Sequence, residues 1–253
     1  MRLPLELAHR RYVQQSGWTE PMRRHLFRRA HLHTALRVLE VGCGTGAVLG
    51  NIAVSSDTRL FGLDIDLAAL RFAQQQYETI KLAGGDANRL PYQDSAFDIV
   101  FYHYVLLWLQ EPISALLEAR RVTRAGGAVL AFAEPDYSQR VDEPASLAEL
   151  GKLQTEALRA QGADPELGGR LAGLFQAAGF TMVESGQLEP SIEHDKNEAS
   201  ALLEWETLRA DVQGRLSDKE LDRLAKEDRR TRRSGERILH VPTYYAWAAV
   251  KQS

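Results

Sequence analysis

Hydrophobic residues in the first half of the chain form short runs separated by segments with helical periodicity. Five runs have the length and composition of buried strands, at residues 37–41, 59–63, 79–83, 98–103 and 128–133. Asp66 is placed to cap a helix after the second run, and Gly126-Gly127 ends a helix before the fifth. Strands that alternate with helices predict an α/β fold with a parallel sheet covered by helices on both faces.

The second half of the chain is richer in helical patterns. Apolar residues recur at helical spacing in four segments, at residues 146–157, 165–178, 201–212 and 217–226. Two further strands are predicted, at residues 180–186 and 239–251, and the second is rich in tyrosine, tryptophan and valine. The pattern therefore predicts seven strands.

Three glycines occupy five positions directly after the first strand, at Gly42, Gly44 and Gly46. The hydrophobic run after them favours a helix, and a strand, a glycine turn and a helix N-terminus together bind a nucleotide or an anion. Asp64 follows Gly44 by 20 residues, the spacing of an acid that binds a ribose diol. Because residues 42–47 also satisfy the dinucleotide pattern, an NAD-dependent oxidoreductase stays open at this point.

Four longer stretches carry a specific resemblance. VLEVGCGTG (38–46), LFGLDID (60–66), GGDANRLPYQDSAFDIVFYHYVLLWLQEP (84–112) and RRVTRAGGAVLAFAEPD (120–136) follow one another in the chain. In their residues and their order they resemble the motifs of the class I S-adenosylmethionine-dependent methyltransferases, especially the small-molecule branch related to ubiquinone and menaquinone biosynthesis. The resemblance implies a Rossmann-like, doubly wound, seven-stranded sheet. Its last strand is expected to run antiparallel between its neighbours, with helical cap insertions.

The same resemblance implies a site for S-adenosylmethionine. Asp64 would accept hydrogen bonds from the ribose, Asp86 and the Ala87 N–H would contact the adenine, and Ile65 would pack on its face. The methionine end would be held by Glu40, the backbone of Gly42, Cys43 and Gly44, and the carbonyl of His103. His103 and Tyr104 are the nearest candidates for a general base, and no base or metal ligand is assigned.

Segments outside these motifs are expected to close the site. We predict an N-terminal helical lid over residues 1–36 and a methyltransferase domain over 37–253, with helical inserts at about 137–178 and 189–237. Tyr12 and Trp18 are expected in an irregular turn, residues 12–19, before a helix capped at Thr19. An aromatic ring there could cover the cofactor and face its sulfonium cation.

Composition narrows the function classes further. One cysteine, Cys43, excludes an internal disulfide, and the absence of a long apolar run predicts a cytoplasmic protein without a membrane span. The net charge of −3 makes nucleic acid an unlikely partner, although arginines gather in residues 2–37 and 229–233. These clusters are either solvated helix faces or attract an anionic substrate or RNA.

The sequence therefore predicts an enzyme, monomer or homodimer, that methylates an oxygen, nitrogen or carbon atom of a small organic molecule. Two alternatives stay open besides the oxidoreductase: methylation of tRNA or rRNA, and a relative that binds the cofactor without catalysis.

Overall fold

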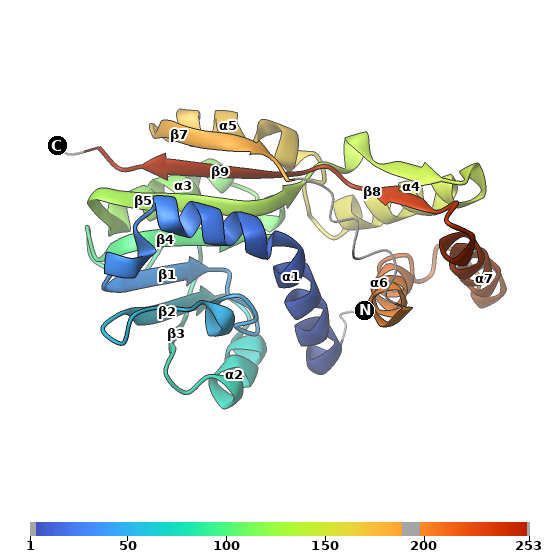
Figure 1. Cartoon of the computed structure of the whole chain (residues 1–253), viewed down its shortest axis with the longest axis horizontal. Coiled ribbons are helices and arrows are strands. Elements are labelled where there is room, and N and C mark those ends of the chain that lie inside the picture. The colour runs from blue at the N-terminus through green and yellow to red at the C-terminus, as the bar shows by residue number, and fades with distance from the viewer. Residues whose placement is uncertain (1–3, 189–197, 252–253) are drawn as a thin grey trace.

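A seven-stranded sheet forms the centre of the computed structural model, which describes residues 4–188 and 198–251 (Figure 1). The strands are β1 (Arg37–Val41), β2 (Arg59–Asp64), β3 (Lys81–Gly84), β4 (Phe97–His103), β5 (Thr123–Pro135), β7 (Thr181–Gln187) and β9 (Thr243–Ala249). Their order is β3-β2-β1-β4-β5-β9-β7, and β9 runs antiparallel to both β5 and β7. The predicted sheet, with its last strand reversed between two neighbours, is confirmed.

Helices cover both faces of this sheet. On one face, α3 (Pro112–Val122) and α5 (Leu167–Ala177) pack on the side chains of Leu39, Val100 and Val129. On the other face, α1 (Leu5–Arg29) packs on residues that alternate with them, such as Val38 and Phe101. A fourth helix, α2 (Leu67–Gln76), lies beside β2 and β3, and its predicted cap is confirmed. Short 3₁₀ turns at Leu32–Thr34, Leu49–Asn51, Leu106–Trp108 and Tyr137–Gln139 connect these elements.

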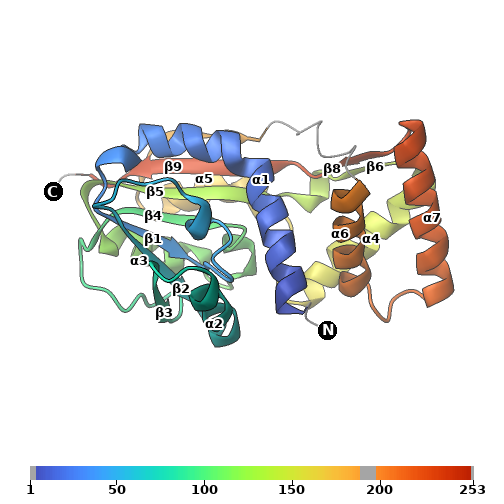
Figure 2. The same ribbon diagram turned by 60° about the horizontal axis from the view of Figure 1, so that its bottom comes forward.

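Helix α1 is continuous where a turn and a helix start were predicted. Pro21 lies inside it, and Figures 1 and 2 show that the helix bends about midway, because proline removes one intrahelical hydrogen bond. The prediction of an irregular turn over residues 12–19 and a cap at Thr19 is therefore wrong. A cap stabilises by about 1 kcal/mol, whereas burying Leu26 and Phe27 beyond the bend contributes about 1.5–3 kcal/mol each.

A smaller lobe stands beside the sheet (Figure 2). A two-stranded ribbon, β6 (Val141–Glu143) and β8 (Ile238–His240), joins α4 (Ala145–Ala160), α6 (Glu198–Asp211) and α7 (Asp218–Ser234). The three helices share a core of six leucine and valine residues: Leu147, Leu150, Leu208, Val212, Leu221 and Leu224. The structure thus divides the predicted insert 137–178, because α4 belongs to this lobe and α5 covers the sheet. Residues 189–197 of the second insert and 1–3 of the predicted lid lie outside the described residues.

Two further predictions are wrong in detail. The single strand expected over residues 239–251 is two strands, β8 and β9, separated at Val241-Pro242, because proline donates no ladder hydrogen bond. The helix expected after the glycine turn is only the 3₁₀ turn Leu49–Asn51, since Gly50 and Asn51 are poor helix formers. The glycine turn therefore acts through its own backbone rather than through a helix N-terminus.

In the part of the chain that the structure describes, no helix is both long enough and apolar enough to span a membrane.

Candidate active site

The glycine turn lies at the carboxyl end of β1, where the strand order changes direction between β1 and β4. Gly42, Gly44 and Gly46 have backbone φ values of 74°, 51° and 75°, which residues other than glycine rarely adopt. A Cβ on Gly42 would lie 2.4 Å from Val105 Cγ2, so packing alone requires glycine there. A Cβ on Gly44 would make ordinary van der Waals contact with the Tyr12 ring at 3.5 Å, so no clash requires glycine there and the Tyr12 ring covers its bare backbone.

Asp64 fixes this turn from the end of the neighbouring strand. Its Oδ2 accepts a hydrogen bond from the Gly44 N–H at 2.6 Å, and its Oδ1 accepts one from the Asp66 N–H at 2.8 Å. Ile65, directly after it, is 77% exposed. An exposed isoleucine between two anchored aspartates presents an apolar surface at the rim of the site.

Asp86 and Ala87 follow β3, the next strand along the sheet. The Asp86 carboxylate is exposed and accepts a hydrogen bond from the Asn88 N–H at 2.9 Å, whereas Ala87 is buried. The Gly85 N–H donates to the Asp64 carbonyl at 3.0 Å and so ties this loop to the end of β2. The structure thus brings Asp64, Ile65, Asp86 and Ala87 to one edge of the sheet.

Glu40 lies under the turn and is 2% exposed. Its Oε2 accepts a hydrogen bond from the Leu49 N–H at 3.1 Å. Burial raises the pKa of Glu40 well above its ordinary value, and the Arg23 charge and the Leu49 N–H oppose that rise. A cation bound beside Glu40 would therefore be strongly favoured, because it would compensate a buried carboxylate.

Cys43 does not act as a nucleophile in this setting. Its side chain is buried, and burial together with the charge of Glu40 raises the pKa of the thiol well above its ordinary value. The protonated thiol is unreactive. Cys43 therefore contributes its backbone and its small size.

The N-terminal half of α1 covers the turn. The ring of Tyr12 is the group closest to the position of a Cβ on Gly44. His9 Nδ1 is hydrogen-bonded to Thr45 Oγ1 at 2.9 Å, and its ring packs at a tilted angle against Phe72 of α2, with the ring centroids 5.1 Å apart. Tyr12 therefore lies over the glycine turn, although its element is a helix and not the predicted loop.

Around the bend at Pro21, a cluster of buried polar side chains that the sequence did not predict joins α1 to β4. Arg23, 6% exposed, donates to the Thr19 hydroxyl and to the Ser16 carbonyl and hydroxyl at 2.8–3.0 Å. The Thr19 hydroxyl is also hydrogen-bonded to His103 Nε2 at 3.0 Å. Burial and the Arg23 charge lower the pKa of His103 to about 3, so the ring is neutral.

Tyr104, with a φ of 57°, is the first residue of the loop after β4, and it lines a cavity. Glu134, fully buried at the end of β5, holds this loop by accepting hydrogen bonds from the Val105, Leu106 and Leu107 N–H groups at 3.1 Å. Burial raises the pKa of Glu134 to about 7 despite these three donors. The loop's conformation therefore depends on one carboxyl group.

The cavity lies between the sheet and the smaller lobe and has a volume of about 600 Å³. Tyr104, Pro135 and Tyr137 line it from the sheet, and Trp18 lines it from α1. The lobe supplies apolar residues, among them Val141, Leu150, Trp205, Leu208, Ile238 and Leu239, and as many charged or polar ones, among them Arg140, Glu204, Asp228, Arg232 and Arg237. Trp18 therefore faces this cavity, while Tyr12 faces the glycine turn, and Trp205 serves both the cavity and the lobe's core.

The arginine clusters are mixed. Most of their described members are exposed, namely Arg10, Arg24, Arg28, Arg29, Arg229, Arg230 and Arg233. Arg23 is buried, and Arg232 is paired with Asp228 at 2.8 Å and Glu204 at 3.1 Å with its side chain only 10% exposed. Arg230, one of the exposed arginines, pairs with Glu227 at 3.0 Å. Solvated helix faces therefore account for most of these charges, and pairing within the chain accounts for Arg230 and Arg232.

The chain's similarities agree with this site. The model of a family described as "Methyltransferase domain" matches residues 39–131. Over 101 residues the chain is 35% identical to the malonyl-[acyl-carrier protein] O-methyltransferase of Pectobacterium atrosepticum, covering 40% of this chain and 39% of that protein. An O-methyltransferase of Aspergillus nomiae is 29% identical over 172 residues, covering 66% and 73%.

The chain spans between 32% and 47% of the length of the first three curated relatives that it matches. Among solved structures, a Bacillus halodurans protein assigned as a methyltransferase superposes with a TM-score of 0.62 at 17% identity, covering 90% of this chain and 98% of that one. The resemblance inferred from the four sequence motifs is confirmed. Residues 39–131 therefore match a methyltransferase domain.

Proposed function

We propose that this chain binds S-adenosylmethionine on the glycine turn and transfers its methyl group to a small organic molecule in the adjacent cavity. One observation carries the proposal: the bare backbone of Gly44 lies between the Asp64 carboxylate and the Tyr12 ring, and Tyr104, directly after the neighbouring strand β4, lines the adjacent cavity. Relatives that are named O-methyltransferases support the reaction class.

The residues at the turn fit the cofactor's chemical groups. Asp64 offers its carboxylate to the ribose diol, with Ile65, Asp86 and Ala87 placed for the adenine. The buried Glu40 carboxylate suits the methionine ammonium, together with the backbone of Gly42, Cys43 and Gly44 and the carbonyl of His103. When bound, the cofactor supplies an electrophilic methyl group on a sulfonium, which an acceptor atom attacks in line.

The protein's own contribution to catalysis is mainly positioning. His103 is a neutral ring with a pKa of about 3, and burial raises the pKa of Tyr104 above its usual range. Neither group readily takes a proton at neutral pH, so we assign no general base. Holding cofactor and acceptor aligned can supply a large rate advantage by itself, since effective molarities for oriented groups reach about 10⁵ M or more.

The rival functions find less support. A dehydrogenase of the parallel-sheet type would not place an antiparallel strand between β5 and β7. RNA methylation is suggested only by the arginine clusters. Two of those arginines, Arg230 and Arg232, form ion pairs with carboxylates of the same chain. We propose a small-molecule acceptor, a cytoplasmic location and a monomer or homodimer.

Calorimetric titration tests the cofactor assignment. We expect S-adenosylhomocysteine to bind at micromolar concentrations and NAD not to bind. Asp64→Asn should weaken binding by about tenfold or more, because it removes charge-assisted hydrogen bonds. Asp57→Asn, on an exposed loop, is the matched control and should bind like the parent. Equal affinity of Asp64→Asn and the parent would show that the ribose lies elsewhere.

A further inference from the structure

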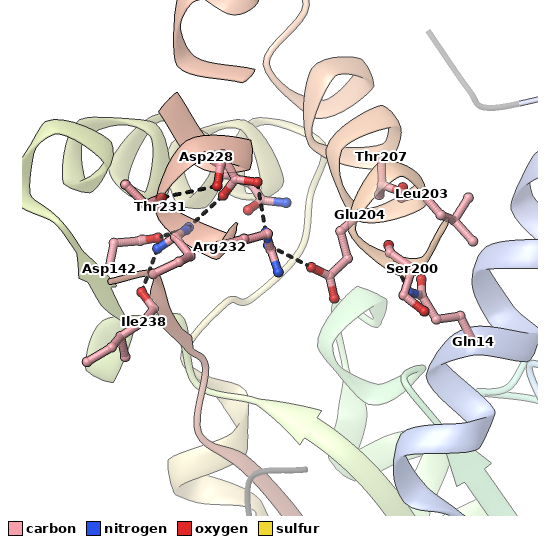
Figure 3. A network of polar contacts seen from close by, with 12 residues as sticks. Gln14, Asp142, Ser200, Leu203, Glu204, Thr207, Asp228, Thr231, Arg232 and Ile238 are labelled. Atoms are coloured by element: carbon pink, nitrogen blue, oxygen red, sulfur yellow. Dashed lines mark hydrogen bonds and ion pairs between the residues drawn. The ribbon is translucent and has the colours of Figure 1, made fainter. Parts of the chain in front are cut away.

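A network of alternating arginines and carboxylates joins the β6–β8 ribbon to α7 and α6 (Figure 3), and most of its members line the cavity. Arg140 on the β6 side contacts Asp142 at 2.5 Å, and Asp142 contacts Arg237 at 2.7 Å. Arg237 contacts Asp228 at 2.8 Å, Asp228 contacts Arg232 at 2.8 Å, and Arg232 contacts Glu204 at 3.1 Å. In each of these pairs a charged donor meets a charged acceptor at hydrogen-bond distance.

Arg11 of α1 ends the network, and its contacts are weaker. Its Nη1 lies 4.0 Å from Glu204 Oε1 and donates to the Gln14 side-chain oxygen at 2.7 Å. Its Nε is buried and has no hydrogen-bond acceptor among the described residues. Asp211 is close enough for the Arg11 charge to lower its pKa, against the larger effect of burial, but it is hydrogen-bonded by Gln154. Among the four arginines of this ion-pair network, Arg11 is thus the one whose hydrogen-bond donors are least satisfied.

The surroundings of Arg11 make its missing hydrogen-bond acceptors energetically unfavourable. The guanidinium carbon lies 4.6 Å from the centre of the Trp18 ring, and the Arg11 side chain is only 15% exposed. A guanidinium in such a place needs acceptors, because it has lost most of its hydration and an aromatic face accepts no strong hydrogen bond. The cavity that Arg11 lines is the space from which further acceptors can come.

We propose that Arg11 binds the carboxylate of the methyl acceptor, and that the acceptor is therefore an organic acid whose apolar body fills the cavity. The carboxylate matches the planar fork of a guanidinium. Trp18, Trp205 and Leu208 supply the apolar walls, and about 600 Å³ is within the usual range for a small-molecule site. This assignment rests on the proposed function, because the acceptor must lie beside the cofactor.

The cofactor's own carboxylate is the rival anion for Arg11. Geometry favours the acceptor: Arg11 lines the cavity together with Trp18 and Tyr104, whereas the next residue, Tyr12, is the one beside Gly44. The two anions lead to different results when Arg11 is replaced.

Calorimetry with matched acids and amides tests the proposal. The probes are 2-naphthoate and octanoate, each paired with its carboxamide and titrated into protein with and without S-adenosylhomocysteine. In the parent, at least one acid should bind about tenfold more tightly than its amide, the scale of a charge-assisted contact. Arg11→Gln should abolish this preference, Arg11→Lys should retain part of it, and Arg10→Gln, on the exposed side of α1, should retain all of it.

Two results would overturn the proposal: no acid preferred over its amide in the parent, or a preference that survives Arg11→Gln. If that surviving preference came with weaker S-adenosylhomocysteine binding in Arg11→Gln, Arg11 would be assigned to the cofactor. Failure of S-adenosylhomocysteine to bind the parent would instead refute the proposed function, and the titrations without it would still report on Arg11.

Discussion

Replacing Gly44 by alanine should separate the stability of the glycine turn from its binding role. Gly44 has a φ of 51°, and Gly214, in the loop between α6 and α7, has a φ of 79°. A left-handed conformation costs an alanine about 1–2 kcal/mol at either position. In a domain of this size each kcal/mol lowers the melting temperature by about 2–4 °C, so both variants should melt about 2–8 °C below the parent.

Only Gly44→Ala should lose affinity for the cofactor. Its new methyl group would lie 3.5 Å from the Tyr12 ring and 4.0 Å from Asp64 Oδ2, inside the space assigned to the cofactor, whereas a Cβ on Gly214 would meet nothing within 4 Å. The fold tolerates both methyl groups, because neither contact is a clash. Thermal unfolding followed by titration with S-adenosylhomocysteine measures both effects. If Gly44→Ala bound the cofactor as tightly as Gly214→Ala, the backbone of Gly44 would not be part of the binding site.

Three further variants test other parts of the structure. Asp228→Ala removes the carboxylate shared by Arg237 and Arg232 and should lower the free energy of unfolding in urea by about 3–5 kcal/mol, whereas Glu227→Ala, which breaks only the more exposed pair with Arg230, should lower it far less. Tyr12→Ala should weaken S-adenosylhomocysteine binding and Val13→Ala should not; similar affinities would remove Tyr12 from the site. Glu134 has a pKa of about 7 when folded, above its ordinary 4.5, so its stabilising contribution is complete below about pH 4.5 and declines toward pH 7. The parent should therefore lose stability relative to Glu134→Gln between about pH 5 and 7.5, and a stability difference that rises with pH would contradict this sign.

The glycine turn and the sheet could be predicted because their signals are local. Gly42, Gly44 and Gly46 all have positive φ, as a turn without side chains requires, and Asp64 contacts Gly44 at the expected spacing. The reversed strand β9 followed from the family resemblance rather than from its own residues. Residues within one motif were therefore placed correctly relative to one another.

Features that depend on distant residues escaped prediction. Threonine is a residue type that often caps a helix. In the structure, however, the Thr19 hydroxyl is hydrogen-bonded to the Ser16 carbonyl and to His103, 84 residues away. The ion-pair network joins residues of α1, α6, α7 and the β6–β8 ribbon, and nothing near any one of them in sequence marks the pairing. Only the folded chain shows which arginines are exposed and which are buried.

The bend in α1 gives one helix two different neighbours. Beyond Pro21 the helix is fixed in the core by Leu26 and Phe27, while before it the consecutive residues Arg11 and Tyr12 face the cavity and the glycine turn. A ligand bound at either place would restrict the same short segment of helix, so we expect occupancy of one site to change the free energy of binding at the other. By thermodynamic linkage that effect is reciprocal: whatever factor the cofactor contributes to acceptor affinity, the acceptor returns to cofactor affinity.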